Sequence, residues 1–168
     1  MFRPKSIILL LTICLVAVSC GLSKSAATMA LHSTTTMECT QITGDGNYII
    51  EVQSMGRNIE KATESALMDA VKGILFEGIT GSSINRIQTQ KPLVHDASVR
   101  IEKQDYFQHF FNSGDYRFYV EALPNIPPRV VKVGGGYKVK VSVILKKQLL
   151  RRRLENDGII KSLGSSFN

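Results

Sequence analysis

The sequence predicts an α+β fold in which a long alanine-striped helix and one or two shorter helices pack on one face of an antiparallel sheet. Three observations predict it. Segments rich in β-branched residues are joined by glycine turns, as in antiparallel hairpins. One helical segment repeats alanine every four residues, which is the spacing of one helix face. The order of strand, helix, strands and helix favours helices gathered on one side of the sheet.

Residues 1–19 are predicted to be the cleavable signal peptide of a lipoprotein. Arg3 and Lys5 precede an apolar run over residues 7–18, which is shorter than the roughly 20 apolar residues that span a bilayer. The run ends at Ala17-Val18-Ser19-Cys20, which resembles the lipobox of bacterial lipoproteins. This resemblance implies that Cys20 carries the lipid that anchors the mature chain to a membrane. The alternative is an ordinary secretory signal with a cysteine by chance.

The residues after Cys20 predict the membrane in which the lipoprotein is anchored and the division of the chain into tether, domain and tail. Gly21 stands where an aspartate would retain a lipoprotein at the inner membrane, so we expect an outer-membrane anchor with the domain facing the periplasm. Residues 20–36 are rich in Ser, Thr and Ala and are expected to be a flexible tether. A single domain over 37–163 and a tail over 164–168 follow. After removal of the signal only Cys39 remains as a free thiol, so no intramolecular disulfide is possible.

The domain is expected to open with a hairpin and a long helix. Gly44-Asp45-Gly46-Asn47 has the composition of a turn, and residues 48–52 are rich enough in β-branched side chains to form a strand. Asn58 is suited to cap a helix over 59–77. Small residues lie on one face of this helix: Ala62, Ala66, Ala70 and Gly73. Such a face allows the helix to lie close to a sheet.

The middle of the chain is less regular. Residues 78–96 contain several Gly, Ser and Pro residues and are predicted to be a long loop with one short strand, and long loops are often functional. A short helix over 103–112 is expected to present three phenylalanines on one face, at positions 107, 110 and 111. Residues 116–123 are predicted to be a strand, and the prolines that follow it favour an extended connection.

The clearest β signal lies near the end of the chain. Residues 137–145 alternate apolar and polar side chains, which indicates a strand with one buried face. The segment 130–133 and the three glycines at 134–136 predict an antiparallel hairpin with it. A helix over 147–156 is expected next, with Leu149, Leu150 and Leu154 turned inward and Gly158 as its stop.

The first half of the domain resembles a known group of proteins. Its features are Gly-Asp-Gly-Asn-Tyr-Ile-Ile-Glu-Val at 44–52, Gly-Arg-Asn at 56–58 and Ala-Val-Lys-Gly-Ile-Leu-Phe-Glu-Gly-Ile at 70–79. They resemble small outer-membrane lipoproteins and the amino-terminal domain of flagellar-assembly protein T. In that group a strand ending in glycine leads into an alanine-striped helix that packs on a sheet. The resemblance implies an accessory or assembly role in an envelope complex, without catalysis.

The sequence contains no recognisable catalytic or metal-binding constellation. The three histidines are scattered, and the pair His95-Asp96 would point in opposite directions on a strand. Ser82 and Ser83 lack the Gly-x-Ser-x-Gly context of a nucleophile elbow. The glycines at 134–136 precede a strand, whereas a phosphate-binding loop precedes a helix. The sequence therefore predicts no enzymatic activity, no cofactor and no metal site.

Basic residues near the end of the chain form a candidate contact patch: Lys146, Lys147, Arg151, Arg152 and Arg153. As a contact surface they would bind anionic lipid headgroups, lipopolysaccharide phosphates or an acidic partner protein. The alternative is a solvated helix face. The export signal and the absence of interleaved aromatic residues argue against a nucleic-acid partner.

Two functions from different classes remain open at this point. The favoured one is a non-enzymatic, lipid-anchored envelope protein that acts as an adaptor or structural component of a periplasmic or outer-membrane assembly, with an envelope protein as its partner. The alternative is a binding module for an envelope glycan or lipid ligand that uses the loop over residues 78–96. The sequence leaves the partner and the oligomeric state open.

Overall fold

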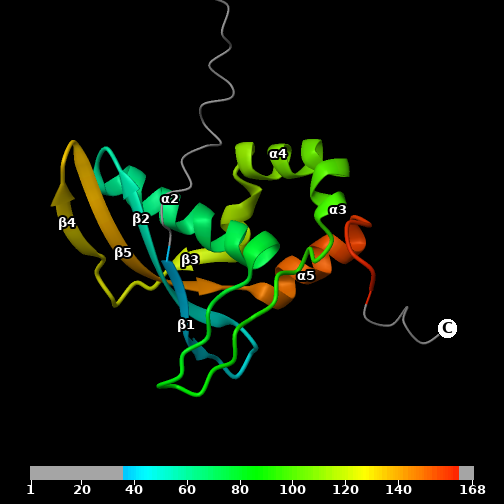
Figure 1. The fold of residues 1–168 in the computed structure, drawn as a ribbon, viewed down its shortest axis with the longest axis horizontal. Coiled ribbons are helices and arrows are strands. Elements are labelled where there is room, and N and C mark those ends of the chain that lie inside the picture. The colour runs from blue at the N-terminus through cyan, green and yellow to red at the C-terminus, as the bar shows by residue number, and fades with distance from the viewer. Residues whose placement is uncertain (1–35, 163–168) are drawn as a thin grey trace, which may run out of the picture. The chain divides into compact units, whose positions relative to one another are not determined.

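The computed structural model describes residues 36–162, which form an α+β domain with a five-stranded antiparallel sheet (Figure 1). Neighbouring strands follow the order β1-β2-β5-β3, and β4 pairs with β5 as well. The long helix α2 packs against β2 and β5. The predicted fold class is therefore confirmed. The predicted signal peptide, Cys20, the tail and all but the last residue of the predicted tether lie outside the described residues.

The domain begins with the predicted hairpin. Strand β1 (Thr36–Ile42) pairs antiparallel with β2 (Tyr48–Gly56). The turn between them is closed by a 2.8 Å hydrogen bond from Thr43 N to Asn47 O, and Gly46 has a φ of 76°, which favours glycine. Strand β2 continues four residues past the predicted end at Val52 because it pairs with β5 along its whole length.

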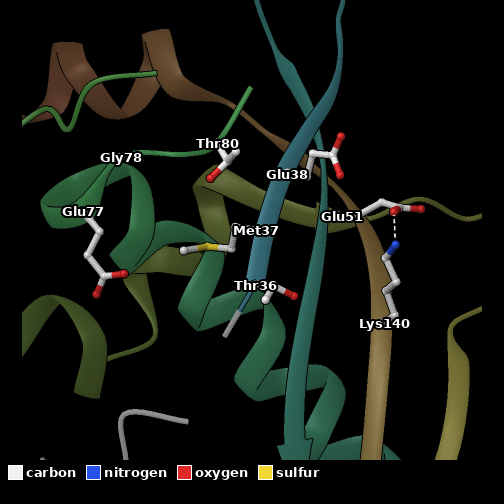
Figure 2. A pocket seen from close by; sticks show the side chains of 8 residues that line it. All are labelled: Thr36, Met37, Glu38, Glu51, Glu77, Gly78, Thr80 and Lys140. Carbon is white, nitrogen blue, oxygen red and sulfur yellow. Dashed lines mark ion pairs between the residues drawn. The ribbon is translucent and has the colours of Figure 1, made fainter. Parts of the chain in front are cut away.

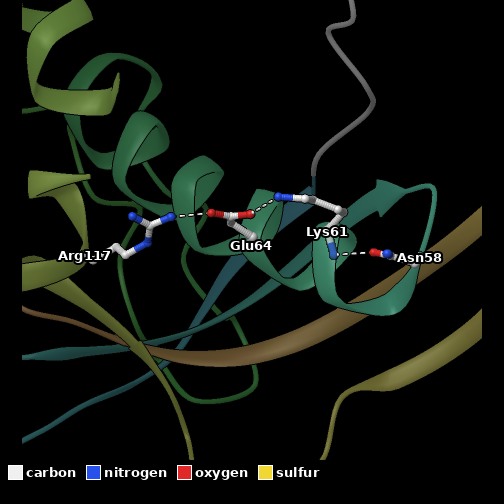
Figure 3. Close-up of polar contacts among 4 residues, drawn as sticks. All are labelled: Asn58, Lys61, Glu64 and Arg117. Carbon is white, nitrogen blue, oxygen red and sulfur yellow. Dashed lines mark hydrogen bonds and ion pairs between the residues drawn. The ribbon is translucent and has the colours of Figure 1, made fainter. Parts of the chain in front are cut away.

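Helix α2 (Ile59–Lys72) begins at the predicted cap, where Asn58 Oδ1 accepts a 2.7 Å hydrogen bond from Lys61 N (Figure 3). One turn later, Glu64 accepts hydrogen bonds from Lys61 and from Arg117. These contacts, that of Lys61 first, lower the pKa of the Glu64 carboxyl. The helix is thereby fixed at its first turns and joined to a distant segment of the chain.

The small-residue face of α2 lies against the sheet, as predicted. Ala62, Ala66 and Ala70 have no exposed surface. The helix then widens into a π-helical turn, η1 (Gly73–Glu77), so the predicted helix over 59–77 has the right extent but two geometries. Gly73 lies close to Met37, and a Cβ atom at this position would require the end of the Met37 side chain to move.

The predicted helix over 103–112 is found as α4 (Gln104–Asn112), and a shorter helix, α3 (Ala97–Glu102), precedes it. Lys103 departs from helical geometry with a ψ of 24° and separates them. The prediction missed α3, which has no buried residue and hence no apolar stripe. Phe107 and Phe110 of α4 are buried and Phe111 is half-buried, so the expected apolar face of this helix is correct.

The predicted strand over 116–123 is wrong for its first half. Residues Asp115–Tyr119 form a 3₁₀-helix, η2, and only Val120–Ala122 form a strand, β3. Tyr116 and Tyr119 are both buried, and their spacing of three residues matches one turn of a 3₁₀-helix. Gly114, with a φ of 86°, starts this turn.

The end of the domain follows the prediction closely. Strand β4 (Arg129–Val133) and strand β5 (Gly136–Leu145) form a hairpin, and Gly134 at its turn has a φ of 46°. Helix α5 (Lys147–Asn156) follows. Its Leu150 and Leu154 are buried, but Leu149 is 49% exposed, so the expectation that all three leucines point inward is wrong for Leu149. Gly158, with a φ of 67°, lies just past the helix.

Candidate interaction surface

Most of the predicted contact patch on α5 is engaged within the domain. Lys146 Nζ lies 3.4 Å from a carboxylate oxygen of Glu121 on β3. Two arginines bind acidic residues four positions along the chain: Arg151 Nε lies 2.8 Å from Glu155, and Arg153 Nε lies 2.5 Å from Asp157. The contact of Lys146 joins the start of α5 to β3, the two arginine pairs lie along α5 and its carboxyl end, and all three charges are largely balanced locally.

Lys147 and Arg152 complete the predicted patch and differ from each other. Lys147 Nζ donates to Gln90 Oε1 at 3.1 Å and lies 5.0 Å from the centre of the Tyr48 ring. Burial is the main cause that lowers the pKa of its amine. Arg152 is exposed and has no hydrogen bond or ion pair with any residue in the described range 36–162. Only one of the five predicted cations is thus free to meet a partner.

The free positive charge gathers instead on the hairpin of β4 and β5. Residues 122–154 contain nine Lys or Arg and no Asp or Glu. Besides that of Arg152, three of the nine side chains make no hydrogen bond, ion pair or ring contact within residues 36–162, namely those of Arg129, Lys132 and Lys138. All three lie on this hairpin. We call them the hairpin cations. In the sequence, the long stretch without acidic residues at 122–154 would have located the hairpin cations. The cluster of basic residues at 146–153 would not.

Apolar side chains are exposed beside the hairpin cations. Val131 is 58% exposed and Val130 is 40% exposed. On the neighbouring strand, Met55 of β2 is also exposed and lies opposite Lys138. Strand β4 carries no buried residue at all, because α2 covers β2 and β5 instead. The hairpin therefore combines unpaired cations with uncovered apolar side chains, a composition that suits a docking surface.

The outer edge of β4 is open. Within residues 36–162, β4 pairs with β5 alone. The two-residue turn makes Val133 and Gly136 a hydrogen-bonded pair, and such pairs alternate along an antiparallel ladder. The backbone N–H and C=O groups of Val130 and Lys132 therefore point away from β5. They form a short edge to which another strand could bind.

The opposite edge of the sheet, at β1, is closed by the loop over residues 78–96. Cys39 N donates to Thr80 O at 2.8 Å, and Asn85 Nδ2 donates to Thr40 O at 2.9 Å. A bridge between Ile79 and Gln90 draws the two arms of the loop together. The expected short strand in this loop is thus an isolated bridge. The loop fills the free side of β1, and this contact distinguishes the two edges of the sheet.

The loop also carries Ser82, Ser83, His95 and Asp96, which the sequence does not favour as catalytic residues. Ser82 is buried and its carbonyl accepts a 2.8 Å hydrogen bond from Ile87 N, while Ser83 is exposed in the turn. Asp96 caps α3 by accepting a 2.8 Å hydrogen bond from Ser98 N, which lowers the pKa of its carboxyl. His95 is exposed beside it. Neither His95 nor Asp96 is paired with a nucleophile among the hydrogen bonds of residues 36–162.

Among the hollows formed by residues 36–162, three border the sheet and the helices. Figure 2 shows one of about 490 Å³ beside β1, in which Glu51 pairs with Lys140 while Glu38 and Glu77 lie on opposite sides of the strand. A second, of about 710 Å³, lies between β1 and residues 85–90. A third, of about 560 Å³, joins residues 93–96 to Arg151 and the end of the domain.

Residues 36–162 hold no group of three or more His, Cys, Asp or Glu side chains placed to bind a metal ion. No helix in that same range is both long and apolar enough to cross a membrane. No protein-family model, curated protein or solved structure matches the chain. The resemblance to envelope lipoproteins and to flagellar-assembly protein T remains a prediction.

Proposed function

We propose that the protein is a non-enzymatic adaptor of the bacterial envelope, anchored through lipid on Cys20 in the outer membrane and facing the periplasm. Its surface for a protein partner is the hairpin of β4 and β5. The observation that carries this proposal is the gathering of the hairpin cations, Arg129, Lys132 and Lys138, beside exposed valines on an open strand edge. The predicted tether over residues 20–36 would let that surface reach a partner while the lipid holds the chain.

Charge reversal provides the test of this function. One variant changes Arg129, Lys132 and Lys138 to glutamate. A matched control changes three exposed cations elsewhere to glutamate: Lys91, Lys103 and Arg152. Both variants change the net charge by the same amount and leave the structural ion pairs of α5 intact. Complexes are then isolated from gently solubilised membranes, with a photo-crosslinking side chain at position 131 to capture the neighbour in intact cells.

The proposal expects a defined protein complex that persists in the control and is lost in the hairpin variant. Recovery of the unaltered protein only as a monomer, or equal loss of the complex in both variants, would contradict it. The anchor is tested separately with an alkyne analogue of palmitate: we expect labelling of the unaltered chain and none of a Cys20→Ser variant. Labelling that survives in this variant would place the lipid elsewhere.

The alternative function, a binding module for an envelope glycan or lipid, is favoured by one observation. The hollow of about 710 Å³ between β1 and the loop over 78–96 is lined by amide side chains from both segments: Gln41, Asn85, Gln88 and Gln90. Amides of this kind can bind hydroxyl groups. Deleting the loop would also expose the β1 edge and the buried Leu93 and Val94. A Gln41→Ala, Gln88→Ala double variant is therefore the cleaner test against peptidoglycan fragments and lipopolysaccharide, and retention of ligand binding would remove the hollow from consideration.

A further inference from the structure

Resting on the proposed function, we infer that the open edge of β4 binds an extended, acidic segment of a partner protein as an additional strand of the sheet. The inference specifies the conformation of the partner segment, which is extended, and its charge, which is negative. Strand addition to a free sheet edge supplies affinity through backbone hydrogen bonds, and side chains that alternate along the added strand supply specificity. Three features of β4 support this mode of binding.

The first feature is the direction of the backbone. The register of β4 on β5 leaves the N–H and C=O groups of Val130 and Lys132 pointing outward. Pro127 and Pro128 precede the strand and Gly134 follows it, so the edge is limited to residues 129–133. Five residues span about 17 Å in a strand. The edge is long enough to bind a short segment and too short to template extended aggregation.

The second feature is charge. An added strand would place its side chains beside Arg129 and Lys132, and directly opposed charges of opposite sign stabilise such pairs. The segment 122–154 provides no acidic residue to balance these cations. Paired antiparallel with a second copy of the same edge, Lys132 would lie opposite Val130 and diagonal to the Lys132 of that copy, with no acidic residue to balance either charge, which disfavours pairing of the protein with itself through β4. An acidic segment is the complementary partner.

The third feature is the apolar surface on both faces of the strand. Pairing partners on β5 place Val131 on the same face as Lys138 and Val130 on the face of the buried Val139. An added strand therefore meets a valine on each face, and an apolar residue opposite Val131 would cover it. The best segment carries acidic residues opposite Lys132 and Arg129 and apolar or β-branched residues opposite the valines, and this pattern can be built into a probe.

The probe is a synthetic peptide with glycine at both ends and a central run of valine, glutamate, valine, threonine and glutamate. Aligned antiparallel, these residues lie opposite Val133, Lys132, Val131, Val130 and Arg129 in that order. The second and fourth backbone amides then face β4. N-methylation of those two amides removes the hydrogen bonds and preserves the side chains, and N-methylation of the third and fifth is the matched control.

Affinity is measured by fluorescence anisotropy with the full chain purified in detergent. We expect methylation of the second and fourth amides to weaken binding by about tenfold or more, because two backbone hydrogen bonds are lost. The control methylation should change affinity by less than about twofold. Added salt should weaken binding of the unmodified peptide because the exposed charges are screened. Equal effects of the two methylation patterns would overturn strand addition.

A protein variant provides an independent arm. Lys132→Pro removes the outward N–H, which takes no part in the ladder with β5, and Lys132→Thr removes the same charge but keeps the N–H. We expect Lys132→Thr to bind the peptide more tightly than Lys132→Pro, and amide exchange at Val130 to slow when the peptide binds. Should Lys132→Pro unfold, the methylated peptides still decide the question.

The outcomes also separate this inference from the proposed function. If the charge-reversed hairpin loses the native complex while both methylated peptides bind alike, the adaptor function stands and strand addition is wrong. Binding of the hairpin to phosphatidylglycerol vesicles, with no binding of the acidic peptide, would overturn both and identify a membrane surface as the occupant. A dimer that Lys132→Pro dissociates would replace the acidic segment with a second copy.

Discussion

A hydrogen bond between α4 and the end of α5 allows one stability prediction to be worked out fully. Tyr106 Oη donates to a carboxylate oxygen of Asp157 at 2.6 Å, and Arg153 Nε donates to the same oxygen at 2.5 Å. Tyr106→Phe removes the first contact and preserves the ring, which packs edge-on to Phe107. The substitution therefore isolates the hydroxyl.

The size of the expected loss of stability depends on the surroundings of this hydrogen bond. A hydrogen bond to a charged group stabilises a protein by about 1.5–3 kcal/mol. The Asp157 side chain is 26% exposed and keeps Arg153 as a partner, so water and the guanidinium replace part of the loss. We expect Tyr106→Phe to lower the free energy of unfolding by about 1 kcal/mol near pH 7.

The pH dependence of this loss has a definite sign. The hydrogen bond from Tyr106 is the largest cause that lowers the pKa of Asp157, so its contribution is present above about pH 4 and is lost as pH falls through the folded-state pKa. Burial, together with Asp157, raises the pKa of Tyr106 to about 12. At alkaline pH, the contribution of the hydrogen bond to stability is complete below about pH 10 and is lost towards pH 12. The difference between the two proteins should be constant from about pH 5 to 9 and shrink outside that window.

Urea unfolding at pH 3, 5, 7 and 9 measures the difference by linear extrapolation. Tyr137→Phe is the matched control, because no residue in the range 36–162 makes a hydrogen bond to the Tyr137 hydroxyl. It should leave stability within about 0.5 kcal/mol of the unaltered protein. Equal stabilities of the two variants at pH 7, or a difference that persists unchanged at pH 3, would refute the reasoning.

Three further predictions concern the packing of the domain. Gly56→Ala should cost about 1–3 kcal/mol in urea unfolding because its Cβ would lie 2.8 Å from a backbone Cα atom of α2, whereas Gly44→Ala, with nothing within 4 Å, should cost less than about 1 kcal/mol. Leu150→Ala should cost about 2–5 kcal/mol, and the same change at the half-exposed Leu149 should cost about 0.5 kcal/mol or less; comparable losses would show that α5 is placed wrongly. Cys39 is fully buried and burial raises the pKa of its thiol, so peptide mapping should find it alkylated by N-ethylmaleimide only in concentrated urea, and rapid alkylation of the native protein would contradict the position of β1.

The parts of the fold that depend on local sequence could be predicted from it. The cap at Asn58, the alanine face of α2 and the glycine turn of the last hairpin are each encoded within a few residues. The strand prediction failed at 116–119 because aromatic and β-branched residues favour strands in general. Burial of two tyrosines three residues apart, which only the packed structure reveals, selects a 3₁₀-helix instead.

The candidate surface was harder to predict because charge in a sequence does not show which charges are paired. The run at 146–153 is the densest in the chain, yet acidic partners on β3, within α5 and just after α5 pair with three of its five cations. Glu121 is 25 positions away from Lys146 in the sequence, so no local pattern links them. The hairpin cations are spaced more widely and look less like a patch. That the hairpin cations are unpaired becomes evident only when the partner of each charged side chain is known.

The loop over residues 78–96 covers the β1 edge of the sheet, and this position bears on both proposed functions. The loop binds β1 through Thr80 and Asn85 and so removes one edge from competition for a partner strand. With β1 contacted by the loop, the open edges among the described strands are those of β3 and β4, which both pair with β5 alone, and the hairpin cations favour β4 for an acidic strand. A ligand that displaced the loop would uncover β1 and create a second edge. A loss of specificity for the acidic peptide when Asn85 is changed to Ala would therefore connect the loop to partner binding, because the loop contributes by keeping the wrong edge closed.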